Sequence, residues 1–272
     1  MPEFFWLLPV GFALGAYGTL IGAGGGFLLV PILLLMYPKD SPHTIATISL
    51  TVVFFNALSG SIAYARMRRI DYKSGLLFST ATVPGAIVGA LATDRMPRQP
   101  FDLLVGVLML AICVFLLSRP ASSGVGVSGG WVMRRRIVEA DGTVHTYAYN
   151  PVLGVGLSLG VGFLSSLLGI GGGIIHVPIM ANLLHFPVHV ATATSHFTLA
   201  IMTLTGSAVH ALEGDFVGVF GRIVPLSIGV AAGAQLGAGL ARWVGGVWII
   251  RALVAALAFV GVRLIVLAWH GG

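Results

Sequence analysis

The chain contains long stretches without a charged side chain. No Asp, Glu, Lys or Arg occurs within Phe4–Pro38, Ser74–Thr93 or Gly142–Leu212. Because about 20 consecutive apolar residues cross the hydrocarbon core of a bilayer, such runs predict membrane helices. A water-soluble globular fold is excluded, since soluble domains carry roughly a quarter charged residues and this chain carries 9%.

The size of the chain limits what lies outside the membrane. At about 20 residues per crossing, 272 residues leave no room for a sizeable extramembrane catalytic domain, so the function must lie in the membrane part. The net charge of +6 would suit nucleic acid, but the basic residues concentrate beside apolar runs, at Arg66–Lys73 and Arg134–Arg136. That placement is typical of the positive-inside rule, and no nucleic-acid partner is expected.

Eight apolar segments form two groups of four, covering residues 4–37, 43–65, 74–93, 101–118, 151–184, 189–211, 217–241 and 248–268. The groups are related: IGAGGGFLLVP (Ile21–Pro31) matches LGIGGGIIHVP (Leu168–Pro178), and LSGSIAYA (Leu58–Ala65) matches LTGSAVHA (Leu204–Ala211). Internal duplication of this kind is common in secondary transporters. We expect an all-α polytopic membrane protein with two homologous four-segment repeats, residues 1–118 and 151–272.

The polar linker, residues 119–150, separates the two repeats. It begins Ser/Gly-rich and continues as WVMRRRIVEADGTVHTYAYN, in which Asp141-Gly142 stands between two β-prone runs. An Asp-Gly pair in that setting is typical of a hairpin turn. We expect a small cytoplasmic hairpin that serves as a connector, with docking or regulation as the alternative role.

The first segment of each repeat is too long for one ordinary helix. A helix over residues 4–37 would reach roughly 50 Å, against a core of about 30 Å. Either it spans at a tilt, which gives four crossings and parallel repeats, or it is a re-entrant pair of short helices, which gives three crossings and inverted repeats. The acidic loop at Glu213 and Asp215 fits an outer face and favours inverted repeats, each beginning with a glycine-broken helix.

Glycine clusters interrupt the two long segments at equivalent places. They lack the Lys and Ser/Thr of a Walker motif and no Rossmann strand pattern surrounds them. Consecutive glycines allow the backbone to leave helical geometry, so that free N–H groups at the next helix start face an anion. We predict a paired anion cradle, with tight helix packing as the alternative, formed by Gly24, Gly25, Gly26, Gly171, Gly172 and Gly173.

Polar side chains gather in the segment that follows each break. Hydroxyl and amide groups donate hydrogen bonds to oxyanions without a fixed charge. The alternative is hydrogen bonding between or within helices. The residues that we predict to bind substrate are Ser49 and Asn56 in the first half and Thr194 and Ser195 in the second.

Histidine is concentrated in the second half, where His176 and His196 interrupt apolar stretches. An ionisable group within the membrane is a functional candidate, and histidine titrates near neutrality. Both are therefore predicted at the substrate site and as proton-coupling groups, with a neutral structural role as the alternative. His185 and His189 have the HxxxH spacing but flank a Pro-containing turn, no carboxylate partner supports a metal cluster, and Cys113 is the only cysteine, so no metal site is predicted.

The repeated GxGGGxxxxP break, the AxATS stretch at Ala191–Ser195 and the two-times-four arrangement resemble the TauE/SafE family of sulfite and organosulfonate transporters. The first half departs from the second, with Ile45–Ser49 reading IATIS. The resemblance implies a multi-pass secondary carrier of small sulfur oxyanions in the cytoplasmic membrane, commonly an exporter, with no tightly bound cofactor. Its partners would be the anionic substrate and the lipid bilayer, and a homodimer is left open.

The sequence by itself leaves two other functions open. A histidine-ligated membrane redox enzyme would need the rings of His176 and His196 to face each other across helices. An anion channel would differ from a carrier by a flux that does not saturate.

Overall fold

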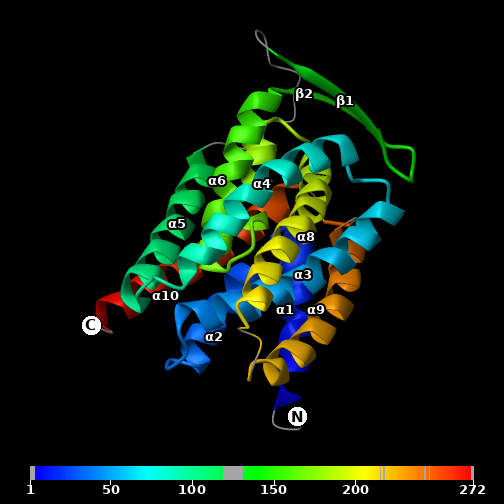
Figure 1. The fold of residues 1–272 in the computed structure, drawn as a ribbon. Coiled ribbons are helices and arrows are strands. Elements are labelled where there is room, and N and C mark those ends of the chain that lie inside the picture. Colours follow the sequence, from blue (N-terminus) through cyan, green and yellow to red (C-terminus); the bar gives the residue numbers. More distant parts are fainter. Residues whose placement is uncertain are drawn as a thin grey trace.

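The computed structural model describes residues 4–118, 131–214, 216, 218–241, 243–244 and 246–270, and it is mostly helical (Figure 1). The start of the linker, residues 119–130, and Asp215 of the acidic loop lie outside this part. The helices of the first half are α1 (Leu7–Ile21), α2 (Gly26–Met36), α3 (Pro42–Arg66), α4 (Tyr72–Thr93) and α5 (Arg98–Ser118). Those of the second half are α6 (Pro151–Leu168), α7 (Gly173–Pro178), the π-helical η2 (Ile179–Leu183), α8 (Val188–Leu212), α9 (Phe220–Ala241) and α10 (Gly246–His270).

Each half begins with an interrupted helix. In the first half α1 ends at Ile21 and α2 begins at Gly26. In the second half α6 ends at Leu168 and α7 begins at Gly173. With 15 residues in α1 and 11 in α2, neither helix reaches the length of about 20 residues that a full crossing needs.

The two halves are interleaved. α1 packs along α9 of the other half, and α6 packs in the same way along α4. α3 and α8 lie against each other, α3 also contacts α9, α8 also contacts α4, and α5 packs on α10 (Figure 1). Each of these contacts therefore has a counterpart in which the two halves exchange roles.

Glycines allow the interleaved helices to approach closely. A Cβ on Gly229 of α9 would lie 2.3 Å from the carbonyl oxygen of Leu8, and one on Gly85 of α4 would lie 2.3 Å from that of Leu159. Such contacts between small residues and backbone hold helices together in lipid, where the hydrophobic effect between helices is weak.

Within the described part of the chain, four helices combine the length and the apolar composition needed to cross a membrane, namely α3, α4, α6 and α9. α8 is as long as α3, with 25 residues in each, but α8 carries many buried threonine, serine and histidine side chains. Large apolar side chains such as Leu117 and Val88 are exposed on the outside of the bundle, as expected for a surface that faces lipid. The chain is a multi-pass membrane protein.

The linker contains a two-stranded antiparallel hairpin, β1 (Met133–Val138) and β2 (Val144–Tyr149). Asp141-Gly142 lies in the turn between the strands, and Gly142 has a φ of 89° there. The hairpin lies at the end of the helix bundle opposite the N-terminus (Figure 1). It therefore marks one face of the protein.

Candidate functional site

Glycines with positive φ form both helix breaks. Gly22, Gly24 and Gly25 have φ between 74° and 80° in the first half, and Gly169 and Gly171 have φ of 66° and 71° in the second. A residue with a Cβ pays about 1–2 kcal/mol for this left-handed conformation. The breaks therefore depend on glycine at these positions for their backbone shape.

The two breaks touch each other. A Cβ on Gly26 would lie 2.4 Å from the carbonyl oxygen of Ile170, and one on Gly173 would lie 2.4 Å from that of Gly22. At Gly26 and Gly173, two of the predicted site residues, the backbone of one break is thus in direct contact with the backbone of the other. Gly172 differs, because its φ is −69° and a Cβ there would meet side chains, those of Met202 and Val161 at 3.1 Å, and not backbone.

One face of α3 lies over both breaks. Ala46 is the neighbour of Gly169, Val53 contacts Gly24 and Gly171, and Asn56 contacts Gly25. Residues spaced by three or four share one face of a helix. Ser49, which lies between residues 46 and 53, therefore belongs to the face that meets the breaks.

The corresponding face of α8 meets the breaks from the other half. Thr192 lies against Gly22, and Leu199 lies against Gly24 and Gly171. The same spacing places Ser195 on this face. The positions equivalent by the duplication, Ser49 and Ser195, are thus presented to the breaks from α3 and α8.

The hydroxyls of Ser49 and Ser195 are fully buried and have no hydrogen-bond partner within the described structure. Three further buried hydroxyls near the breaks, those of Thr192, Ser165 and Ser166, share this state. Buried polar groups in native proteins almost always have partners, and the exceptions call for an explanation. A bound polar ligand would provide it.

Asn56 joins the first break to α1. Its Nδ2 donates to the carbonyl oxygen of Gly24 at 2.9 Å, and its Oδ1 accepts from the Thr19 hydroxyl at 2.6 Å. Tyr64 donates to the carbonyl oxygen of Thr19 at 2.7 Å. Sequence reasoning missed Thr19 and Tyr64; the hydroxyl of Thr19, within an apolar run just before the glycines, was the available signal.

His196 is fully buried and continues this network. Its Nε2 lies 3.2 Å from the Thr19 hydroxyl, and its ring meets that of Tyr64 edge to face at 5.6 Å. Since the single hydroxyl proton of Thr19 goes to Asn56, Nε2 of His196 must be the donor to Thr19. Nδ1 is then the ring nitrogen that can take up a proton.

His176 lies apart from this network. Its Nε2 is 3.1 Å from the hydroxyl of Ser158, and its ring meets that of Phe78 at 5.6 Å. The ring of His196 packs on Tyr64 and that of His176 on Phe78, so these contacts give no support to the bis-histidine pairing that a haem site needs. The one group of metal-binding side chains found within the described residues, His43, His210 and Glu213, lies elsewhere.

Thr194 faces the loop between α3 and α4. Its hydroxyl accepts the backbone N–H of Asp71 at 3.0 Å. The carboxylate of Asp71 is buried and accepts from Arg135 at 2.8 and 2.5 Å, from Tyr147 at 2.7 Å and from Ser74 at 2.6 Å. Burial raises the pKa of Asp71, but these hydrogen bonds outweigh it and hold the pKa below its ordinary value. Thr194 is thus connected to the hairpin through Asp71.

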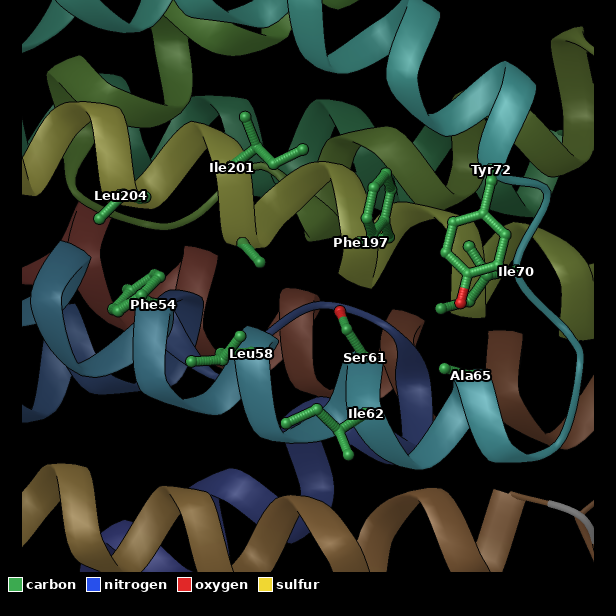
Figure 2. Close-up of a pocket in the computed structure, with 11 residues that line it drawn as sticks. Phe54, Leu58, Ser61, Ile62, Ala65, Ile70, Tyr72, Phe197, Ile201 and Leu204 are labelled. Carbon is green, nitrogen blue, oxygen red and sulfur yellow. The ribbon is translucent and has the colours of Figure 1, made fainter.

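An apolar cavity of about 400 Å³ lies between α3 and α8 (Figure 2). Its wall is formed by side chains such as Phe54, Leu58 and Leu204, and its hydroxyls are those of Ser61 and Tyr72. Placing an anion against such a wall would cost several kcal/mol without compensating donors. The apolar wall of this cavity therefore argues against an anion site there.

Comparisons with known proteins agree on one class. The family model described as sulfite exporter TauE/SafE matches residues 7–264. The probable membrane transporter protein YunE of Bacillus subtilis is 32% identical over 270 residues, which cover 97% of each chain. The probable membrane transporter protein MJ0441 of Methanocaldococcus jannaschii is 27% identical over 239 residues, which cover 84% of this chain and 81% of that one. No solved structure matches the chain significantly.

Proposed function

The chain belongs to the TauE/SafE family and is a membrane transporter, and on this premise we propose that it carries small sulfur oxyanions, such as sulfite or organosulfonates, out of the cell across the cytoplasmic membrane. The observation that carries the proposal is the pair of buried hydroxyls without partners, Ser49 and Ser195. They lie on the faces of α3 and α8 that meet the glycine breaks, where α2 and α7 begin.

An anion at this place would receive hydrogen bonds from two sources. The first amides of a helix have no partner within it and carry a partial positive charge, and the serine hydroxyls can each donate one bond. The contact of Gly26 with Ile170 and of Gly173 with Gly22 leaves no room for an anion between the breaks. Substrate entry therefore requires the breaks to move apart, and we take the packed arrangement as the closed state of a carrier.

We further propose inverted repeats with three crossings in each half, α1–α2 and α6–α7 being re-entrant. α6 is long enough to cross a membrane, but Phe186, which follows α7, contacts Tyr147 of the hairpin with ring centroids 4.4 Å apart, which supports a return of the chain to the face where α6 begins. The exchanged packing of α1 with α9 and of α6 with α4 supports a two-fold relation between the halves. The hairpin and the basic α3–α4 loop lie together, as the Asp71–Arg135 ion pair requires, and the positive-inside rule assigns that face to the cytoplasm.

Cysteine labelling tests the topology. In a Cys113→Ala background, Leu212→Cys should react from outside and Asp141→Cys from the cytoplasm. Labelling of both positions from the same side would contradict the inverted arrangement.

His196 is our candidate for proton coupling, with His176 second. A sulfonate keeps its charge at physiological pH, and holding it in a low-dielectric site needs compensation. The network from His196 through Thr19 and Asn56 ends on Gly24, so the imidazole is connected to the first break. A proton taken up at Nδ1 would complete the neutralisation of the anion.

A thermal-shift panel on the purified protein tests the substrate class. Sulfite, thiosulfate, sulfoacetate, taurine and sulfate are compared at equal ionic strength with a neutral solute. The proposal expects stabilisation by at least one reduced or organic sulfur oxyanion above that by sulfate, together with saturable flux of the same anion in proteoliposomes. No shift with any sulfur anion would refute it, and a flux that does not saturate would indicate a channel.

A further inference from the structure

Two histidines and a glutamate converge where α3 begins and α8 ends. His43 is the second residue of α3, His210 lies in the last turn of α8, and Glu213 caps that helix. The imidazole rings of His43 and His210 meet at 4.7 Å with an angle of 77° between them. Nδ1 of His210 lies 3.9 Å from Oε2 of Glu213.

These three side chains each offer one ligand atom, and the three atoms lie within 4.8 Å of one another. In a tetrahedral Zn²⁺ site with bonds of about 2.0–2.1 Å, neighbouring ligand atoms are roughly 3.3 Å apart. The longest of these separations therefore has to shorten by about 1.5 Å to fit such a site. Glu213 is exposed at the end of its helix, so its side chain is free to supply that movement.

The burial of the three residues forms a path from solvent. Glu213 is exposed, His43 is half-buried and His210 is fully buried. An ion would thus meet a carboxylate first and then two imidazoles. His210 and Glu213 are separated by three residues on one helix, a spacing that places both on the same face.

The ligand chemistry selects the kind of metal. Imidazole suits Zn²⁺ and similar transition ions, whereas Mg²⁺ and Ca²⁺ prefer oxygen ligands only. Two histidines and one glutamate are a known zinc ligand set, with the fourth position open to water. We propose that His43, His210 and Glu213 bind Zn²⁺ and thereby tie the start of α3 to the end of α8. The sequence analysis predicted no metal site because it found no carboxylate partner for the histidines; the proposal departs from that prediction because Glu213 lies beside His210.

Titration of tag-free, chelator-treated protein with Zn²⁺ tests the proposal. Isothermal titration calorimetry should show one saturable site per chain, and Co²⁺ in its place should give the visible absorption of tetrahedral coordination. Glu213→Gln and His43→Ala avoid the fully buried ligand and should each weaken Zn²⁺ binding by tenfold or more. His189→Ala, at the opposite end of α8, is the matched control and should bind as the wild type does.

Two results would overturn the assignment. One is the absence of saturable Zn²⁺ binding by folded wild-type protein. The other is an unchanged affinity in both Glu213→Gln and His43→Ala. Neither measurement uses transport, so the metal site and the proposed substrate can fail separately.

Discussion

The backbone N–H of Asp71 donates a hydrogen bond to the hydroxyl of Thr194, with 3.0 Å between the two atoms. Thr194 directly precedes Ser195 in α8, and the carboxylate of Asp71 is held by Arg135 of the hairpin. The hairpin is therefore connected, through Asp71, to the helix whose face with Ser195 meets the glycine breaks.

Arg135→Ala should destabilise the protein strongly. It leaves the carboxylate of Asp71, whose side chain is fully buried, without its charged partner, and breaking a buried pair in this way costs about 3 kcal/mol or more. Arg134, the neighbouring residue, is exposed on the opposite side of β1, so Arg134→Ala is the control. Thermal unfolding in detergent should show a clearly lower Tm for the first variant alone; equal Tm values would contradict the role of the ion pair.

The contribution of Asp71 should depend on pH. Its pKa in the folded protein lies below the ordinary value, so its stabilisation is complete above an unfolded-state pKa of about 3.9 and is lost as the pH falls through the lower, folded-state pKa. The difference in Tm between wild type and Asp71→Asn should therefore be constant near neutrality and shrink below about pH 4. A difference that stays constant down to pH 3 would exclude this linkage.

Ser49→Ala and Ser195→Ala should impair substrate binding without loss of stability. Each removes a hydroxyl that has no partner in the described structure, so the fold loses no hydrogen bond. A hydrogen bond to a charged group contributes about 1.5–3 kcal/mol, which predicts a loss of anion affinity of roughly tenfold or more. Ser61→Ala is the matched control, because this buried hydroxyl of α3 also has no partner but lines the apolar cavity. Wild-type affinity in both serine variants would remove these serines from the site.

Gly172→Ala and Gly26→Ala should have different effects. Gly172 has an ordinary helical φ, and its new methyl group would meet only side-chain atoms, of Met202 and Val161 at 3.1 Å, so folded yield should persist while transport falls. The methyl group in Gly26→Ala would lie 2.4 Å from the carbonyl oxygen of Ile170, so this variant should lose folded yield. Size-exclusion profiles and proteoliposome flux measure the two quantities. Unchanged transport kinetics in Gly172→Ala would count against the anion cradle.

His196→Gln should flatten the pH dependence of transport. Glutamine keeps a side-chain donor for Thr19 but cannot take up a proton, so coupling fails while the network with Asn56 is retained. The measurement is anion flux in proteoliposomes between pH 5.5 and 8. His176→Gln is the comparison, since that ring bonds to Ser158 instead. If both variants keep the wild-type profile, histidine does not couple transport to protons.

The helices were more predictable than the directions in which they face. The segment expected at residues 43–65 is α3, Pro42–Arg66, and the turn expected at Asp141-Gly142 lies between β1 and β2. Membrane helices are apolar toward lipid and apolar toward the packed interior, so the amphipathic pattern that orients a helix in a soluble protein is weak here. For this reason the sequence could not show that Ser195 lies on the face of α8 that meets the breaks. Nor could it show that its neighbour Thr194 contacts Asp71.

The partners of His196 were hidden for a related reason. Thr19 and Tyr64 come from α1 and α3, and no local spacing links them to a residue of α8. The equivalence of Ser49 and Ser195, by contrast, was visible because duplication preserves the position of a residue within its helix. Sequence thus predicted the two serines as a pair, and the packing of α3 and α8 on the breaks shows what their helix faces meet.

The packing of α1 on α9 has a consequence for biosynthesis. α1 ends at Ile21 and α9 begins at Phe220, so at typical translation rates the ribosome needs roughly 10 to 40 s to make the partner after the first helix has left it. Through that interval the small-residue face of α1, which includes Gly11 and Gly15, has only lipid or the insertion machinery against it. When α6 emerges from the ribosome, its partner α4 has already been made. The second broken helix can therefore reach its partner α4 before the first broken helix can reach its partner α9.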